Sequence, residues 1–240
     1  MSPQLPLQFQ SHTIRYSSAN FIAHEGVRAA IEAIVTLAIT RRFALVYIHG
    51  PRGSGKTHLA VYLAGALREQ VPHARFVAGA TGARWFAEEL PSDPIRAEEV
   101  VLLDDADLFI GELAGSGTFG DLVERVRGAN GLLVLFGETL PAAITKDPYI
   151  KSRIEAGVTL FIGQPREADL DRLLDSVVRQ RGLNLTEAKR SFLLKRIPRT
   201  LPAVVECAER LERAGEEGAL STSFEVLAEA ALGGAAAGAK

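Results

Sequence analysis

The segment Gly50–Thr57 constrains the fold of this chain more than any other feature of its sequence. It reads Gly-Pro-Arg-Gly-Ser-Gly-Lys-Thr, follows the β-rich apolar run Leu45–His49, and leads into a helical pattern that extends to about Gln70. The glycines permit a tight turn whose backbone N–H groups face an anion, and the lysine supplies a charge for β- and γ-phosphates. The threonine supplies a hydroxyl for Mg²⁺. The segment therefore predicts a phosphate-binding loop in an α/β fold, rather than an ordinary glycine turn.

The residues of this loop are the predicted nucleotide contacts. They are Gly50, Pro51, Arg52, Gly53, Ser54, Gly55, Lys56, Thr57 and the following His58.

Short apolar runs alternate with helical segments through the first two thirds of the chain. The expected strands after the loop are Ala74–Ala78, Val100–Leu103, Gly131–Phe136 and Val158–Ile162. The expected helices are His24–Arg42, Gly55–Gln70, Arg84–Leu90 and Phe119–Val126, with a mobile glycine-rich loop over Gly111–Gly120. Continuous apolar strands that alternate with helices indicate right-handed βαβ units and a parallel sheet.

After Pro165 the sequence predicts helices only. These are Arg166–Arg181, Thr186–Arg196, Thr200–Ala214 and Ser221–Leu232; Thr186, Thr200 and Ser221 occupy N-cap positions, and Gly182 and Gly215 are expected helix stops. The predicted division is an extended arm (1–16), a nucleotide-binding core (17–164), a small helical subdomain (165–232) and a disordered tail (233–240).

Composition excludes several classes of protein. The formal charge is −2, without the basic surplus expected of a protein that holds DNA through its phosphates, so direct sequence-specific DNA binding is not expected. The single cysteine, Cys207, cannot form an internal disulfide, which favours a reducing compartment. No secretory signal is visible, and the most apolar helical stretch, Ala29–Thr40, is too short to span a bilayer. We therefore expect a cytoplasmic protein.

Two further elements can take part in phosphate chemistry. Asp104 and Asp105 end a buried strand, where one carboxylate can hold Mg²⁺ through water and the other can orient an attacking water. A turn or helix cap is the alternative, but the phosphate loop favours the functional interpretation; nearby Asp107 is expected to cap the following turn. Arg153, just before the last strand, can reach a neighbouring molecule's γ-phosphate or form a surface ion pair, and the pattern alone does not decide.

Taken together, these elements resemble the AAA+ domain of the DnaA family, from about Ser18 to Leu232. The resemblance implies a P-loop AAA+ αβα core with a five-stranded parallel sheet, a C-terminal all-helical lid, and ATP or ADP with Mg²⁺ as cofactors. Asn20-Phe21-Ile22 looks like the family segment that lines the adenine pocket, and Arg153 falls on the arginine finger. Phe192–Ile197 resembles the lid segment before the second sensor.

The chain ends directly after the lid, so it resembles the short DnaA paralogues of the Hda type. That resemblance implies a partner role: docking on the DNA polymerase sliding clamp and promoting hydrolysis of DnaA-bound ATP. The arm supports it, because Gln4-Leu5-Pro6-Leu7-Gln8-Phe9 is similar to clamp-binding peptides. The expected anchors are Gln4, Leu5, Leu7 and Phe9. A homodimer or larger homo-oligomer through the finger face is also possible.

The sequence departs from the family at both sensors. Glu138 stands where the family usually has aspartate, and Pro202 stands at the position matched to the lid arginine. Proline donates no hydrogen bond, and Arg199 is close enough to substitute. The resemblance then implies retained nucleotide binding and weak intrinsic hydrolysis.

Three hypotheses remain open. The chain can be a regulator that presents Arg153 to DnaA, an ATP-driven initiator- or helicase-loader-type ATPase, or a scaffold with nucleotide as a structural ligand. Trp85, Phe86 and Cys207 are expected to be buried packing residues.

Overall fold

The computed structural model describes residues 9–10, 15–16, 21–113, 117–216 and 224–232. Several predictions lie outside these residues: the arm anchors Gln4, Leu5 and Leu7, the adenine-pocket residue Asn20, the N-cap Ser221, the tail 233–240 and part of the 111–120 loop. Phe9 is described in its backbone only, within the two-stranded pair of β1 (Phe9–Gln10) and β2 (Arg15–Tyr16).

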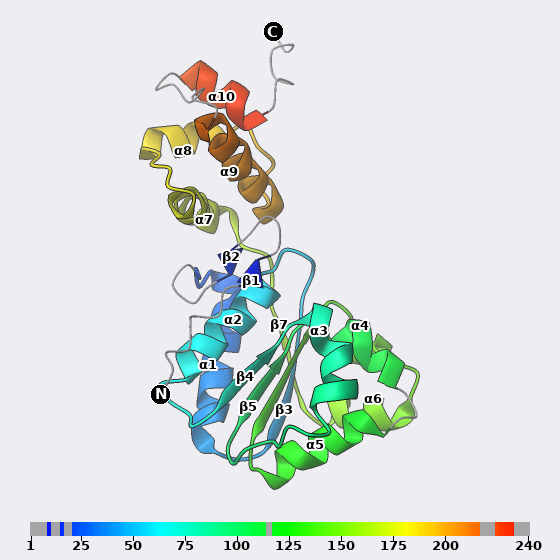
Figure 1. Ribbon diagram of the computed structural model, residues 1–240. Coiled ribbons are helices and arrows are strands. Elements are labelled where there is room, and N and C mark those ends of the chain that lie inside the picture. Colours follow the sequence, from blue (N-terminus) through cyan, green and yellow to red (C-terminus); the bar gives the residue numbers. More distant parts are fainter. Residues whose placement is uncertain (1–8, 11–14, 17–20, 114–116, 217–223, 233–240) are drawn as a thin grey trace. The chain divides into compact units, whose positions relative to one another are not determined.

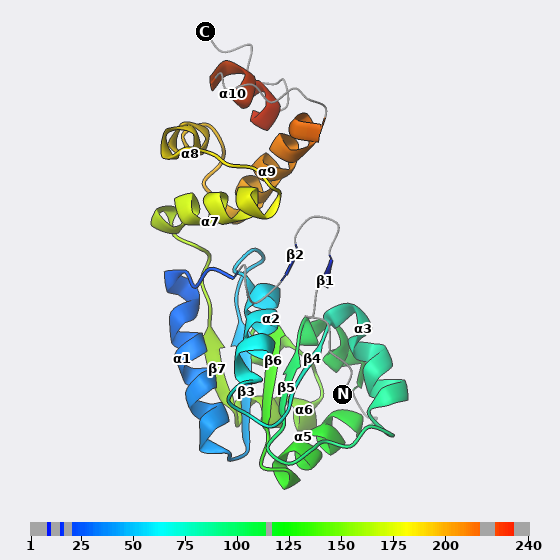
Figure 2. The same cartoon turned by 60° about the vertical axis from the view of Figure 1, so that its left-hand side comes forward.

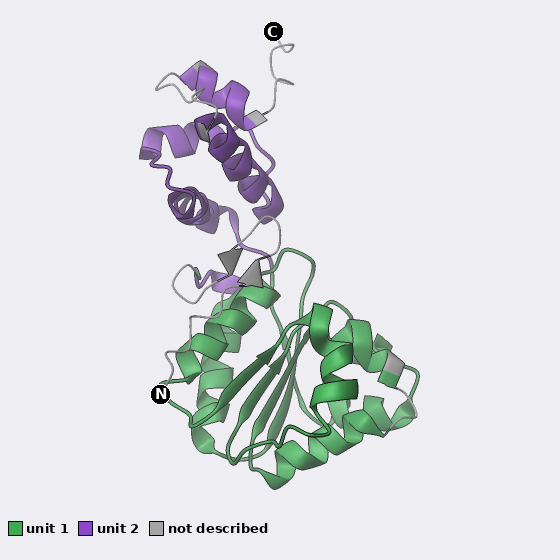
Figure 3. Ribbon diagram, in the orientation of Figure 1, with its two compact units in different colours: residues 1–8, 16–21, 27–163 green, residues 9–15, 22–26, 164–240 purple. Residues whose placement is uncertain are grey.

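The chain divides into two compact units, which Figure 3 colours separately. The first contains the described residues of 16–21 and 27–163, and the second contains those of 9–15, 22–26 and 164 onward.

The first unit is built on a five-stranded parallel sheet, as predicted. Its strands are β3 (Ala44–His49), β4 (Ala74–Val77), β5 (Val100–Leu103), β6 (Leu132–Gly137) and β7 (Val158–Phe161), in the order β4-β5-β6-β3-β7. The register pairs His49 with both Gly137 and Phe161. The carboxyl ends of the strands therefore meet along one edge of the sheet.

Helices cover both faces of this sheet (Figures 1 and 2). One face carries α1 (Glu25–Thr40) and α2 (Lys56–Leu67). The other carries α3 (Gly79–Arg84), the π-helical turn η2 (Trp85–Glu89), α4 (Ala106–Phe109), the 3₁₀ turn η3 (Ile110–Leu113), α5 (Thr118–Gly128), the 3₁₀ turn η4 (Pro141–Ala143) and α6 (Pro148–Glu155).

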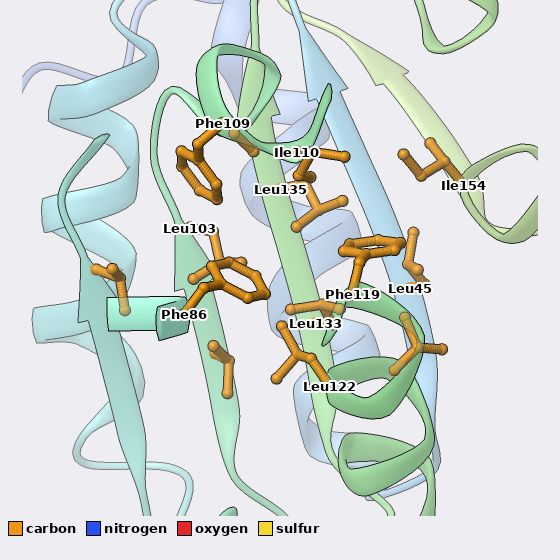
Figure 4. Close-up of a cluster of buried hydrophobic side chains, with 14 of the residues drawn as sticks. Leu45, Phe86, Leu103, Phe109, Ile110, Phe119, Leu122, Leu133, Leu135 and Ile154 are labelled. Atoms are coloured by element: carbon orange, nitrogen blue, oxygen red, sulfur yellow. The ribbon is translucent and has the colours of Figure 1, made fainter. Parts of the chain in front are cut away.

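Alternate residues of the central strands face two separate cores. Val100 and Leu102 of β5 pack with α1 and α2, whereas Val101 and Leu103 pack with the helices of the other face. Figure 4 shows the second core, in which Leu103, Leu133 and Leu135 meet Phe86, Phe109 and Phe119. Burial on both faces explains why these strands read as continuous apolar runs.

Several local predictions need correction. The short helices α4 and α6 were not expected, because their few residues show too little periodicity to reveal a buried face. The helical segment around Trp85 begins earlier than expected, at Gly79. Trp85 and Phe86 are buried as predicted.

The second unit is helical, as predicted. It contains α7 (Glu167–Gln180), α8 (Glu187–Leu194), α9 (Leu201–Glu216) and α10 (Phe224–Leu232). Its core is a cluster of buried side chains from these helices that includes Leu174, Val178, Leu193, Val204, Ala208, Leu211 and Leu227. Cys207 belongs to this core, and burial raises the pKa of its thiol to about 11.

The helix ends of the second unit agree with the sequence in most places. Thr186 accepts a hydrogen bond from the backbone N–H of Lys189, and Thr200 accepts one from Ala203. Gly182 follows α7 with φ of 73°, a left-handed conformation that suits glycine. Gly215 was expected to stop a helix, but it lies within α9, which continues to Glu216.

Among the described residues, no helix combines the length and the apolar character needed to cross a membrane.

Candidate functional site

The loop between β3 and α2 has the backbone of an anion-binding turn. Gly53 and Gly55 have φ values of 80° and 90°, which glycine adopts without steric cost. A Cβ atom on Gly50 would lie 2.2 Å from the carbonyl oxygen of Ile162, so no side chain fits there. Gly55 caps α2 without any side chain, which leaves the first N–H groups of the helix available to an anion.

Lys56 lies along this loop rather than in solvent. Its ammonium donates hydrogen bonds to the carbonyl oxygens of Gly50 (2.8 Å) and Pro51 (3.2 Å), and its side chain is 7% exposed. Its Nζ also lies 3.7 Å from Oε1 of Glu138. The ammonium group predicted to meet phosphates is therefore held at the loop by the carbonyl oxygens of Gly50 and Pro51 and by the carboxylate of Glu138.

Asp104 lies beside Thr57 at the end of β5. The Thr57 hydroxyl is hydrogen-bonded to the Asp104 carboxylate, and Oδ1 of Asp104 is buried without a hydrogen-bond partner in the part of the chain that the structure describes. The pKa of Asp104 is raised to about 6, first by burial and then by the charge of Asp105, against the lowering effects of Thr57 and Lys56.

This pair fits a magnesium ion that is brought by a nucleotide. Hydroxyl and carboxylate oxygens are ligands that Mg²⁺ prefers, directly or through water, and the unpaired Oδ1 is an acceptor without a donor. Thr57 and Asp104 would hold the ion, which would neutralise phosphate charge.

Asp105 follows in a strained conformation. Its φ of 47° and ψ of 38° lie in the left-handed region, and a Cβ atom on Gly79 would lie 2.4 Å from the Asp105 Cβ. Burial and the charge of Asp107 raise the pKa of Asp105, whereas Lys56 lowers it. Strained residues of this kind concentrate at functional sites, which is consistent with the predicted role of Asp105.

Glu138, the predicted first sensor, follows β6 and reaches the same loop through its contact with Lys56. The prediction for Asp107 was wrong, because it caps no turn of its own. Instead its Oδ2 accepts hydrogen bonds from the backbone N–H groups of Glu138 and Thr139. Asp107 thus bonds backbone groups 31 and 32 residues further along the chain, which no local pattern reveals.

Phe21 packs on the helix that follows the loop. Its ring stacks on Tyr62 at 4.4 Å and meets His58 edge-on at 5.2 Å. Tyr62 was not predicted, although its position one helical turn after His58 places both rings on one face of α2. Ile22 packs instead with the core of the second unit.

Arg153, the predicted finger, lies on α6 and is held by two neighbours. Its guanidinium stacks 3.5 Å from the ring centroid of Tyr149 and lies 3.7 Å from Glu124. The side chain is 26% exposed. Both predicted possibilities, a surface ion pair and a group that can reach another molecule, agree with this position.

Arg199, the predicted lid contact, belongs to the second unit and forms an ion pair with Glu167. Pro202 lies in the first turn of α9, where the missing N–H would have no helical partner. The first unit thus brings together Lys56, Thr57, Asp104, Asp105 and Glu138 at one edge of its sheet.

Comparison with known proteins shows what the chain resembles. No family model matches the chain. An uncharacterised protein of Haemophilus influenzae is 26% identical over 170 residues, which are 70% of this chain and 73% of that protein. The replication initiator DnaA of Thermus thermophilus is 23% identical over 195 residues. The chain is similar in sequence to DnaA and has the fold of DnaA domain III.

The match to DnaA covers most of this chain but only part of that relative. The matched region is 76% of the chain but only 45% of Thermus DnaA, so the chain spans less than half the length of that relative. Domain III of Thermotoga maritima DnaA matches with a TM-score of 0.72 at 16% identity, over 90% of this chain and 95% of that one.

Two further solved structures have the same fold. DnaA of Aquifex aeolicus, bound to AMPPCP, matches with a TM-score of 0.63 at 20% identity, over 88% of this chain and 67% of that one. A RuvB variant of Thermotoga maritima matches with a TM-score of 0.63 at 17% identity, over 90% and 71%. These structural matches establish the fold. At identities this low they do not establish the chemistry, which depends on the residues of the site.

Proposed function

We propose that this DnaA-related chain is an Hda-like regulator of replication initiation. In this proposal it binds ATP or ADP with Mg²⁺ at the Gly50–Thr57 loop, docks on the sliding clamp through its N-terminal arm, and promotes hydrolysis of DnaA-bound ATP. The observation that carries the proposal is the arrangement of Lys56, Thr57 and Asp104 at the open N-terminus of α2. The relation to DnaA, one of whose structures holds AMPPCP, supports an adenine nucleotide.

Arg153 is the proposed finger. Stacking on Tyr149 and the ion pair with Glu124 keep its guanidinium at the surface of α6, where a second molecule can approach it. An arginine supplied by one protein to a nucleotide held by another stabilises transition-state charge and is worth about 10³- to 10⁵-fold in rate.

Replacement of this side chain tests the finger. Arg153→Ala should abolish stimulation of DnaA ATP hydrolysis, while nucleotide binding and thermal stability of the variant stay close to those of the parent. Arg127→Ala is the matched control, because Arg127 also contacts Glu124 (3.6 Å) and stacks on a ring, that of Phe43. Full stimulation by Arg153→Ala would contradict the mechanism and favour a scaffold with a structural nucleotide.

Clamp binding is tested separately, because it depends on the arm. The double replacement of Leu7 and Phe9 by alanine should abolish binding to the sliding clamp of the same organism, measured by surface plasmon resonance. Gln8→Ala, between the proposed anchors, is the control and should bind like the parent. If the parent does not bind the clamp, the Hda-like role loses its most specific support.

The hydrolytic residues favour one other function, that of an ATP-driven initiator- or helicase-loader-type ATPase. Asp104, Asp105 and Thr57 lie together as a hydrolytic site requires. Fast ATP turnover by the isolated protein, lost in Lys56→Ala, would support this alternative over the regulator.

A further inference from the structure

The two residues that follow β6 are anchored by hydrogen bonds from two other elements. Oδ2 of Asp107, on α4, accepts from the backbone N–H of Glu138 (2.8 Å), the backbone N–H of Thr139 (3.0 Å) and the Thr139 hydroxyl (2.5 Å). The hydroxyl of Tyr47, on β3, donates to the carbonyl oxygen of Thr139 at 2.6 Å. Because both the N–H groups and a carbonyl oxygen of this segment are bonded, its backbone has little freedom to shift.

Gly137 permits this arrangement. A Cβ atom there would lie 2.4 Å from the Tyr47 hydroxyl oxygen and 2.9 Å from Cγ of Asp107. Any side chain at this position would push both anchors away from the segment. The fully buried ring of Tyr47 fixes its hydroxyl in turn.

The consequence of this anchoring appears at the phosphate loop. The Glu138 side chain is 54% exposed and has no anchor of its own comparable to those of its backbone, yet its Oε1 lies 3.7 Å from Lys56 Nζ. Lys56 is the cation predicted to meet the phosphates of a nucleotide. A carboxylate at this distance competes with a phosphate for the same charge.

We propose that Asp107 and Tyr47 are positioning residues that hold Glu138 beside Lys56, so that its carboxylate competes with nucleotide phosphates and weakens nucleotide affinity. The inference rests on nucleotide binding at the Gly50–Thr57 loop, which is part of the proposed function. Asp107 and Tyr47 then affect nucleotide affinity indirectly, through the position of the Glu138 carboxylate beside Lys56.

The direct effect is measured with Glu138→Gln. Isothermal titration calorimetry with ATP, and separately with ADP, in the presence of Mg²⁺ should show binding tightened about two- to fivefold, as expected for removal of a partly exposed ion-pair partner. Asp107→Ala and Tyr47→Phe should tighten binding by a smaller factor, because the freed segment lets Glu138 leave Lys56. Tyr47→Phe changes no charge, so its effect can arise only from position.

Two comparisons separate positioning from electrostatics and from damage to the fold. Asp107→Asn keeps an acceptor oxygen and loses the charge, so it should restore much of the parent affinity that Asp107→Ala changes. In a Glu138→Gln background, Asp107→Ala should have no further effect on affinity, because the group it positions is gone. Thermal unfolding without nucleotide verifies that each variant is folded.

The outcomes distinguish the inference from the function on which it rests. An Asp107→Ala effect that persists undiminished in the Glu138→Gln background, or that Asp107→Asn reproduces in full, would overturn the positioning role while leaving nucleotide binding intact. Nucleotide binding that is equal in the parent and in Lys56→Ala would overturn the proposed nucleotide site, and the positioning role with it.

Discussion

The neighbouring strands β5 and β6 end at the same edge of the sheet, yet the polar groups that follow them differ in how well they are satisfied. After β5, Asp104 is 2% exposed with Oδ1 unpaired within the described structure, and Asp105 has a left-handed backbone. After β6, the backbone N–H groups of Glu138 and Thr139 are both bonded to Asp107.

This difference separates a region that is costly to fold from one that stabilises the fold. A buried, unpaired carboxylate oxygen and a strained backbone both raise the free energy of the folded state. Hydrogen bonds to a charged acceptor lower it by about 1.5–3 kcal/mol each. Substitutions after β5 should therefore raise stability at the expense of ligand binding, whereas substitutions after β6 should lower stability.

The largest expected effect is that of replacing Lys56, which interacts with the carboxylates that follow both β5 and β6. Its charge lies near Glu138 and lowers the pKa values of both Asp104 and Asp105. Lys56→Ala should weaken nucleotide binding at least about 100-fold, because the lysine is expected to bond both the β- and the γ-phosphate and hydrogen bonds to charged groups are worth about 1.5–3 kcal/mol each.

Calorimetric titration with ATP measures this change, and Lys151→Ala is a control for loss of a lysine elsewhere in the same unit. Lys151 pairs with Glu155 on the surface of α6. Affinity that Lys56→Ala leaves unchanged would contradict the assignment of the loop.

The second prediction tests whether the β5 end is costly to fold. The pKa of Asp104 is raised from 3.8 to about 6, so the folded protein binds this proton more tightly than the unfolded chain. The contribution of Asp104 to the unfolding free energy is therefore greatest below about pH 4, falls as the pH rises to about 6, and is constant above. Asp104→Asn, which stays neutral, should stabilise the protein by up to about 3 kcal/mol at pH 8.

Urea denaturation at pH 4, 6 and 8 measures this prediction, and the difference between parent and variant should grow between the first and the last. The same variant should lose Mg²⁺-dependent nucleotide binding. A difference in stability that does not change with pH would show that Asp104 is not destabilised by burial of its charge.

The fold could be predicted from the sequence because its strands are buried on both faces. Val100–Leu103 and Leu132–Phe136 are uninterrupted apolar runs, and the structure places them at the centre of the sheet. Helices α4 and α6 were missed because four and eight residues carry too little period.

The groups that follow β5 and those that follow β6 also differ in how far the sequence predicts them. The phosphate loop and Asp104 could be found from the sequence because they are contiguous segments whose chemistry fixes their spacing. The anchors of Glu138 could not, because Asp107 and Tyr47 are 31 and 92 residues from the atoms they bond. Such contacts depend on the order of strands in the sheet, which the sequence pattern does not specify.

The third prediction tests the β6 end. Tyr47→Phe removes the hydroxyl that donates to the Thr139 carbonyl and leaves that acceptor without its partner. The protein should lose about 1 kcal/mol of unfolding free energy, measured by urea denaturation. Tyr62→Phe is a suitable control, because it also removes a hydroxyl but retains the ring that stacks on Phe21. Equal losses in the two variants would mean that the Thr139 bond has no special value.

The smallest expected effect is that of Asp105→Asn. Asparagine tolerates the left-handed conformation as well as aspartate does, so the strain at φ of 47° should remain. Only the charge is lost, and this charge raises the pKa of Asp104. The fall in unfolding free energy with pH should therefore move to lower pH, with a gain in stability at pH 8 of less than about 1 kcal/mol. In an Asp104→Asn background the same substitution should remove only the pH dependence that the raised pKa of Asp105 itself contributes. A fall that stays at the parent's pH would mean that desolvation alone sets the proton affinity of Asp104. Burial of the Asp104 carboxylate, and not its repulsion by Asp105, would then account for the raised free energy of the folded state at the end of β5.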